Sequence, residues 1–340
     1  MKHIGKALII AGALSLSGIV FLGIGSRMLY AERKNGITQT DKEYEKKQYT
    51  TNVSGIETIE TDLSSDNISV EPGEGDAIEI VYYDEIDDPK YQISEKSGTL
   101  RITHKPSTTF FLFQIPDLSL VWSGEDTQII TIKIPKSYAG DYDLYLGSGT
   151  ISISDLEIKE RLKVDATSGT VKLDNLTCKK DVEVEISSGN LTIDNVEVQR
   201  NMTCRSTSGH ANVQDITVGE DWTILISSGS IDVTTATVDG TLKADFTSGK
   251  IIAKTVSASE VLTEISSGSI DLDELTVEKG ISASATSGKV IVSLTDSMNN
   301  YKITSEVTSG HCNLPDDFGN GDKYIDVDIS SGNVNFSFKE

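Results

Sequence analysis

The stretch SSGNLTIDNVEVQRNMTCRSTSG, residues 187–209, contains one period of a repeat that organises most of this 340-residue chain. Its Ser-Gly step occurs ten times at intervals of 19 to 22 residues, and six of the nine intervals are 20 residues. A constant period of this length indicates a repeat architecture, in which each unit buries its apolar face against its neighbours. The glycines of the ten steps are Gly149, Gly169, Gly189, Gly209, Gly229, Gly249, Gly268, Gly288, Gly310 and Gly332.

Apolar residues alternate with polar residues after each of these glycines. Leu191 and Ile193 follow Gly189 after two and four residues, and Val196 and Val198 follow it after seven and nine. Alternation indicates a strand with one buried face, and the odd step from four to seven requires a corner. We therefore predict an all-β fold, a parallel β-helix with rungs of about 20 residues, three short strands and three corners. The alternation of Ser and Thr before the Ser-Gly step leaves a 40-residue coil as the alternative.

The corners carry the residue types that tight backbone turns require. A glycine in every period indicates a positive φ or a position without room for a Cβ atom. The second corner often holds Asp or Asn, for example Asn175 and Asn195, which favours ordinary Asx turns. Carboxylates there, such as Asp174 and Asp194, leave a Ca²⁺ site as the weaker interpretation.

The N-terminus has the composition of a membrane anchor. Residues 1–6 form a short basic tail, and residues 7–25 carry no charge, which is long enough for a membrane-spanning helix. Leu29 stands where a signal-peptidase site requires a small residue, and no cysteine follows the apolar run. We therefore predict an uncleaved single-pass transmembrane helix at residues 7–26.

The orientation of this helix is less strongly indicated. Two lysines precede the span and six Lys or Arg residues follow it before residue 50, so a simple count places the following side in the cytoplasm. The Lys and Arg count predicts orientation poorly when a long domain follows the helix, and a short basic N-terminal segment usually stays in the cytoplasm. We expect the β-helical domain to be extracellular, with a cytoplasm-facing scaffold as the alternative.

Two segments separate the anchor from the regular repeat. Residues 27–50 are polar without a β pattern and are predicted to form a stalk, and residues 51–147 are predicted to form irregular first rungs and a cap. Residues 148–340 form the regular Ser-Gly repeat. The irregular part contains an apolar loop that is either a partner contact or a lid over the end of the β-helix. Its candidate contact residues are Phe110, Phe111, Phe113 and Trp122.

The charge of the chain excludes some classes of partner. The first fifty residues hold 8 Lys or Arg and 4 Asp or Glu, which leaves 22 basic and 48 acidic residues in the remainder. A body this acidic repels nucleic acid and anionic membrane surfaces. It would attract cationic peptides or divalent ions, although an ordinary solvated, non-aggregating surface accounts for the same charge. The candidate partners are a cationic peptide, an envelope protein or an envelope polymer, and the predicted membrane contact is confined to residues 7–26.

The sequence offers little catalytic chemistry. The serines recur at corners, which favours a structural role, and Cys178, Cys204 and Cys312 replace aliphatic residues of the apolar columns. His210 and His311 follow corner glycines five repeats apart, about 24 Å at the spacing of strands, so one metal ion cannot join them. We predict no catalytic residue, no metal site and no cofactor.

The repeat resembles a known bacterial family, the DUF4097-type "putative adhesin" β-strand repeat proteins. The resemblance rests on the recurrent Ser/Thr-Ser-Gly followed by alternating aliphatic residues, and on the strand Ile132-Lys133-Ile134-Pro135. It covers most of residues 51–340. The resemblance implies a β-helical domain that is often tethered to a membrane, with some relatives among cell-envelope stress genes, and it supplies no catalytic residues.

These observations together predict a non-enzymatic, membrane-tethered protein of the cell surface. Its function is expected to be adhesin-like binding or a role in envelope stress. A purely structural envelope scaffold without a ligand of its own is the alternative.

Overall fold

The computed structural model describes residues 44–105 and 129–339. The predicted basic tail, the anchor at residues 7–26 and most of the predicted stalk lie outside the described residues, as do Phe110, Phe111, Phe113 and Trp122. Within the described ranges, no helix has both the length and the apolar character needed to cross a membrane.

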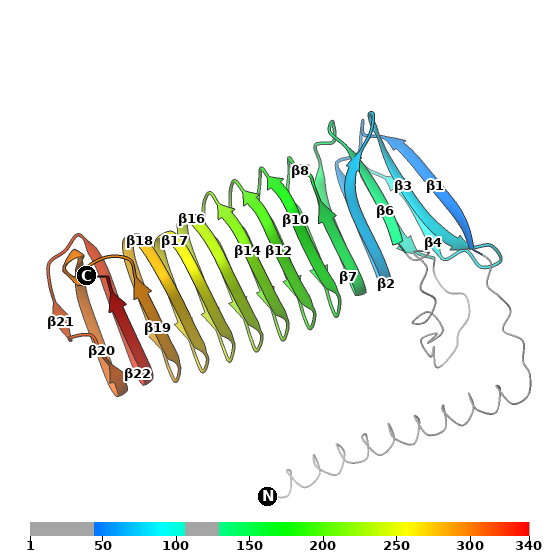
Figure 1. The fold of residues 1–340 in the computed structure, drawn as a ribbon. Coiled ribbons are helices and arrows are strands. Elements are labelled where there is room, and N and C mark those ends of the chain that lie inside the picture. Colours follow the sequence, from blue (N-terminus) through cyan, green and yellow to red (C-terminus); the bar gives the residue numbers. More distant parts are fainter. Residues whose placement is uncertain (1–43, 106–128, 340) are drawn as a thin grey trace, which may run out of the picture. The chain divides into compact units, whose positions relative to one another are not determined.

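The described residues form a parallel β-helix (Figure 1). Val171 pairs with Leu191 and Leu191 pairs with Ala211, so Cα partners in adjacent rungs are 20 residues apart. This register confirms the predicted all-β solenoid and its 20-residue rung, and it excludes the 40-residue coil. The strands of the regular rungs are β7 (Asp141–Ser154), β8 (Glu157–Ile158), β9 (Leu162–Ala166), β10 (Thr170–Cys178), β11 (Val182–Ile186), β12 (Asn190–Val198), β13 (Met202–Ser206), β14 (His210–Val218), β15 (Trp222–Ile226), β16 (Ser230–Phe246), β17 (Lys250–Ile265), β18 (Ser269–Ala285) and β19 (Lys289–Leu294).

Five of the regular rungs bend at a residue in the left-handed region, namely Asp155, Asn175, Asn195, Asp215 and Glu274. Strand β12 runs through Asn195, whose φ is 50°, and the chain then turns again before β13. Asn and Asp tolerate this conformation better than other residues with a side chain. The side chains also join the rungs, because Asn195 Nδ2 donates a hydrogen bond of 2.9 Å to Asn175 Oδ1. The residues of the predicted Asx corner therefore both turn the chain and form a ladder of hydrogen bonds between rungs.

The apolar columns stack into one continuous core. Val184 and Val198, from two faces of neighbouring rungs, are fully buried. Cys178 and Cys204 are free thiols inside this core, and Cys312 is partly buried. Burial raises the pKa of the Cys178 and Cys204 thiols to about 12, so both are neutral at physiological pH.

The corner glycines are required because the rungs approach one another too closely there for a side chain. At every one of the ten corner glycines, a backbone carbonyl oxygen of the adjacent rung lies no more than 3.1 Å from the place of a Cβ atom. The same carbonyls accept inter-rung hydrogen bonds, such as those from Asn190 N to Gly169 O at 3.1 Å and from His210 N to Gly189 O at 3.0 Å. Only Gly149 and Gly310 among the ten have a left-handed φ. The lack of room, rather than a positive φ, is the general reason for glycine here.

At the N-terminal end, the order of the strands in space differs from their order in the chain, because β5 (Thr99–His104) and β6 (Ile129–Pro135) lie on the side of β2 (Thr58–Gly73) that faces away from the regular rungs. Strand β2 pairs with β7 on one side, and on its other side with β5 and β6. Antiparallel strands complete this end. They are β1 (Tyr44–Asn52), β3 (Ala77–Glu85) and β4 (Tyr91–Lys96). These pairings cover the outer edge of β2, so that the antiparallel strands β1 and β4 rather than a rung of the β-helix form the edges at this end in the described residues.

Strand β1 corrects the predicted stalk at residues 27–50. The strand begins at Tyr44, so the last part of that segment belongs to the β fold. Its residues alternate only between half-buried and exposed, because β1 lies at an edge of the sheet and β3 is its one partner among the described strands. An edge strand of this kind has no buried apolar face, which is why the residues showed no β pattern.

At the C-terminal end, the spatial order of the last two rungs is the reverse of their order in the chain, which the repeat did not predict. Strand β22 (Lys323–Phe338) pairs with β18 and β19 on one side and with β20 (Tyr301–Cys312) on the other. The last strand of the chain is thus inserted before β20, and the rung of Gly310 is the terminal rung (Figure 1). His210 and His311 are consequently six rungs apart rather than the five counted along the sequence. A short 3-10 helix η2 (Met298–Asn300) and strand β21 (Asp317–Phe318) complete this end.

The glycine corner makes a quantitative prediction. Replacing Gly229 with Ala should reduce the free energy of unfolding by about 3 kcal/mol, because the new Cβ displaces Gly209 O and weakens an inter-rung hydrogen bond. Gly75→Ala is the control. Gly75 has a φ of +76° but no atom within 4 Å of its Cβ position, so only conformational strain of about 1 kcal/mol is expected there. Chemical denaturation measures both changes, and equal losses would contradict the steric explanation.

Candidate functional site

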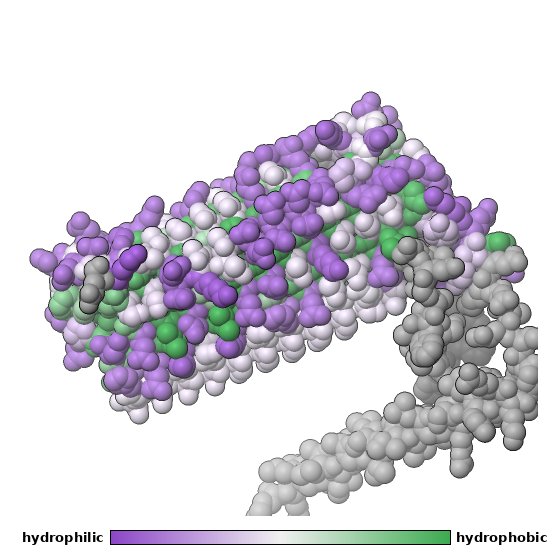
Figure 2. All heavy atoms as spheres, viewed as in Figure 1, coloured by the Kyte–Doolittle hydropathy of each residue, from purple (hydrophilic) through white to green (hydrophobic). Residues whose placement is uncertain are grey.

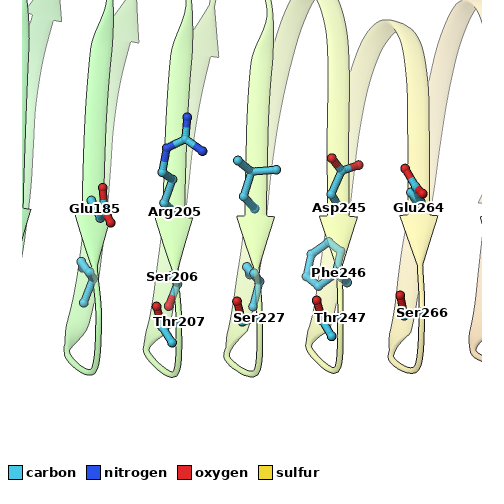
Figure 3. Close-up of a pocket in the computed structure, with 13 residues that line it drawn as sticks. Glu185, Arg205, Ser206, Thr207, Ser227, Asp245, Phe246, Thr247, Glu264 and Ser266 are labelled. Carbon is cyan, nitrogen blue, oxygen red and sulfur yellow. The ribbon is translucent and has the colours of Figure 1, made fainter.

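A groove with a volume of about 490 Å³ crosses five rungs on one side of the solenoid. We call it the acidic groove. Its outer wall is a row of side chains at equivalent positions of successive rungs, four residues before each corner glycine: Glu185, Arg205, Leu225, Asp245 and Glu264. Figure 3 shows Glu185, Arg205, Asp245 and Glu264 in one row, with one further strand between those of Arg205 and Asp245, and the corner hydroxyls of Thr207, Ser227, Thr247 and Ser266 in a second row.

The charges of the acidic groove are only partly neutralised. Arg205 Nε lies 3.6 Å from Glu183 Oε1, and Lys243 Nζ lies 3.0 Å from Asp245 Oδ2. Glu185 and Glu264 form no ion pair within 4.0 Å among the residues that the structure describes. The Oδ1 atom of Asp245 is buried and has no hydrogen-bond partner in the described part of the chain. The groove therefore offers carboxylate oxygens that can accept hydrogen bonds from a cationic ligand.

A second groove of about 430 Å³ follows the Asx corner and is lined mainly by amides and hydroxyls. Asn175, Asn195 and Asp215 form one row, and Thr217 and Thr237 belong to the row beside it. The amides of Asn175 and Asn195 already hydrogen-bond along the ladder, at 2.6 and 2.9 Å. Their principal role is therefore to join rungs. Figure 2 shows that apolar residues on the visible face are scattered among polar ones.

A buried polar cluster joins the first rung to the N-terminal strands. Asp66 is 7% exposed, and its carboxylate accepts a hydrogen bond of 2.5 Å from the Tyr91 hydroxyl and lies 3.0 Å from His104 Nε2. His104 Nδ1 lies 3.4 Å from the hydroxyl of Ser64. Tyr91 and His104 belong to the hairpin β4–β5, so the Asp66 cluster (Ser64, Asp66, Tyr91 and His104) fastens this hairpin to β2.

The place of Asp66 in the repeat explains why it can carry a side chain. Asp66 pairs with Gly149, so it occupies the corner-glycine column in the first rung. No rung of the regular kind precedes it, and its side chain takes the space that such a rung would fill. Burial alone would raise the pKa of Asp66, but the hydrogen bonds from His104 and Tyr91 and the charge of His104 lower it overall. Burial and the neighbouring carboxylate raise the pKa of Tyr91, which keeps its hydroxyl protonated as a donor.

The structure separates the other residues that the sequence singled out. His210 lies at the surface, with Nδ1 2.8 Å from the Ser230 hydroxyl and Nε2 3.8 Å from Asp232. Within residues 44–105 and 129–339, no three His, Cys, Asp or Glu side chains are placed to share a metal ion. The corner glycines lie against the backbone of the adjacent rung, which leaves no room for a side chain at their Cβ positions.

Sequence reasoning missed two features of the site. The acidic groove has a signal in the sequence, because the residue four positions before the corner glycine is charged in seven of the ten repeats, whereas the predicted columns were the apolar ones. The Asp66 cluster had a weaker signal, because Ser65-Asp66 replaces the Ser-Gly step outside the regular repeat. Its partners Tyr91 and His104 are 25 and 38 residues away, and only the fold brings them together.

The lowered pKa of Asp66 predicts the acid sensitivity of the N-terminal end. Its ionised form stabilises the fold fully above the unfolded-state value of 3.8, and that contribution is lost as the pH falls through the lower folded-state value. Asp66→Asn should therefore destabilise this end by about 2 kcal/mol at pH 7, and the difference from the natural chain should shrink below pH 4.

Thermal unfolding across pH 2.5–7, with hydrogen exchange of β4 and β5, measures this effect. Asp62→Asn is the matched control, because Asp62 is an exposed carboxylate of the same strand that pairs with Arg101 at 2.9 Å. A surface pair of this kind contributes less than about 1 kcal/mol. A difference between the Asp66 variant and the natural chain that stays constant with pH would contradict the assigned role.

The fold and its side grooves define the protein as a capped parallel β-solenoid. The family model of the Toastrack DUF4097 domain matches residues 56–260 and 245–337, and the chain belongs to this family. It is a β-solenoid family and not a known family of enzymes. None of the curated proteins compared with the chain matches it.

Two solved structures are similar to this chain. One is a "putative cell adhesion protein" from Clostridium sporogenes, with 13% identity, a TM-score of 0.27, and coverage of 87% of this chain and 100% of that one. The other is a "putative adhesin" from Parabacteroides merdae, with 13% identity, a TM-score of 0.42, and coverage of 88% of this chain and 98% of that one. At these similarities, neither indicates what this chain binds.

Proposed function

We propose that this protein is a non-enzymatic, adhesin-like binding protein of the bacterial cell surface, whose solenoid holds an extended cationic chain in the acidic groove. The observation that carries the proposal is the row of carboxylates in a groove that crosses five rungs. Because rungs repeat about every 4.8 Å, the five positions of the row extend over about 19 Å, which is the length of roughly six residues of an extended peptide. A basic segment of an envelope protein or a cationic peptide fits this pattern, and a basic envelope polymer has the same chemistry.

The electrostatics of the whole chain support a cationic ligand. The formal net charge is −22, and the part after residue 50 is more acidic than that value. Such a field attracts cations over distances of about 10 Å at moderate salt and repels polyanions such as nucleic acid. The groove then supplies close contacts, in which Leu225 gives an apolar surface between Arg205 and Asp245.

We further propose that residues 7–26 anchor the protein in the membrane as a single-pass helix, with the solenoid outside the cell. The uncharged run of residues 7–25 supports the anchor. The short basic head before it supports the orientation. A role in the envelope stress response is compatible with this arrangement, since a surface solenoid can contact cationic peptides that act on the envelope.

The binding proposal can be tested with a fluorescent decalysine peptide and the full chain in detergent micelles. The triple variant Glu185→Gln, Asp245→Asn and Glu264→Gln should bind the peptide about tenfold more weakly, since three exposed charge contacts are worth about 0.5 kcal/mol each. The control is the triple variant Asp174→Asn, Asp194→Asn and Asp273→Asn on the Asx corner. It removes the same charge and should change the affinity less than about twofold.

Equal losses in the two triple variants would show that the peptide senses only overall charge, and the groove would not be a site. An absence of binding by the natural chain would favour the structural alternative, a scaffold without a ligand of its own.

The proposed location is tested by protease treatment of intact cells, with lysed cells as the control. We expect the solenoid to be digested, or cut at its exposed segments, while the cells are intact. Protection until lysis would place it in the cytoplasm, and the surface role would then be wrong.

A further inference from the structure

Among the residues that the structure describes, most of the outer edge of β20 in the terminal rung has no paired strand. Strand β21 pairs with only Ile303 and Thr304 on that side, and Ser305 N donates to Asp316 O at 3.0 Å. From Glu306 to Cys312, no described strand pairs with the outer edge, although β22 pairs with the inner edge throughout. Leu314, 6% exposed, belongs to the loop that returns from β20 to β21. We call the segment from Glu306 to Cys312 the open edge.

A core residue is uncovered at the open edge. Val307 stands in the column three residues before the corner glycine, and it is 37% exposed. In eight other rungs the apolar residue of this column is at most 5% exposed. Val307 is therefore exposed because no further rung covers it among the described residues. Uncovered apolar surface beside free backbone donors and acceptors is typical of an edge that receives another strand.

We propose that the open edge binds an extended segment of a partner protein as an added β-strand, and that this segment carries a basic residue followed by a glycine. The corner column accounts for the glycine, and the carboxylates beside the open edge account for the basic residue. Main-chain hydrogen bonds supply affinity and the side-chain pockets supply specificity in this mode of recognition.

The glycine follows from the corner column. In every regular rung, the carbonyl oxygen of the preceding corner glycine lies where a Cβ atom of the next residue in the column would be. Gly310 continues this column at the terminal rung, and its own Cβ position is blocked by Gly332 O. A strand added in the same parallel register meets the Gly310 carbonyl in the same way. It must therefore place a glycine over Gly310.

The basic residue follows from the charge beside the edge. Glu306 is exposed and pairs in register with Asp328 of β22, so two carboxylates stand next to each other on the same face. Asp326 precedes them on β22, beside Thr304. An Arg or Lys four residues before the partner's glycine lies over Glu306. The like charge of a second copy of this acidic chain makes self-pairing the less favourable occupant.

The chain supplies a probe for this chemistry. A labelled peptide copying residues 201–213, with Cys204→Val to prevent oxidation, contains Arg205 four residues before Gly209. Titrated with the full chain in detergent micelles, it should bind saturably. The same peptide with Arg205→Glu should bind at least tenfold more weakly, and the peptide with Gly209→Val should lose binding.

Variants of the protein locate the binding surface. Val307→Lys should abolish peptide binding, while Ile86→Lys should leave it unchanged, because Ile86 is 49% exposed on the opposite part of the fold. Circular dichroism checks that both variants are folded. Should Val307→Lys unfold the terminal rung, Glu306→Lys replaces it and should weaken binding of the Arg205 peptide by like-charge repulsion.

Four outcomes would overturn the proposal. They are no binding of the Arg205 peptide to the folded chain, equal binding of the Arg205→Glu peptide, equal binding of the Gly209→Val peptide, and binding that survives substitution of both Val307 and Glu306. Concentration-dependent self-association that Val307→Lys removes would identify a second copy as the occupant and would equally overturn it. The decalysine test of the acidic groove does not depend on these outcomes, because the groove lies on other rungs.

Discussion

The close approach of successive rungs at the Ser-Gly corner is the constraint on which the rest of the structure depends. A glycine carbonyl of one rung accepts the N–H after the glycine of the next, at 3.0–3.1 Å, and occupies the space of a Cβ atom. This contact holds the rungs in a parallel register, and the register stacks each apolar residue on its equivalents. The core is thus a consequence of the corner, since a shift of one residue would turn every side chain to the other face.

The same constraint makes the two ends different from the body. At the N-terminal end Asp66 replaces the glycine, because no regular rung approaches it, and its carboxylate holds the β4–β5 hairpin. At the C-terminal end Gly310 keeps the glycine, and the edge beyond it remains open in the described residues. A polar cluster therefore closes the N-terminal end of the stack. The C-terminal end keeps the corner glycine and the unpaired edge of a rung on which another strand could stack.

Because the inward columns are fixed by packing, the outward columns are free to carry function. The acidic groove uses one of these columns over five rungs, and the Asx ladder uses another to join rungs. A solenoid suits this division, since a periodic ligand can meet equivalent side chains at a constant spacing. The net charge of −22 favours the cationic ligand that we propose for this surface.

The sequence by itself determined the rung length, the strand columns and the need for glycine at the corner, because each is a local requirement that recurs in every period. It also determined the buried places of Cys178 and Cys204. Only the tertiary structure decided the order of the rungs at the ends, where β22 enters before β20, since chain order does not fix which edge a strand joins. It alone also brought Tyr91 and His104 to Asp66, because contacts between residues far apart in sequence leave no periodic signal.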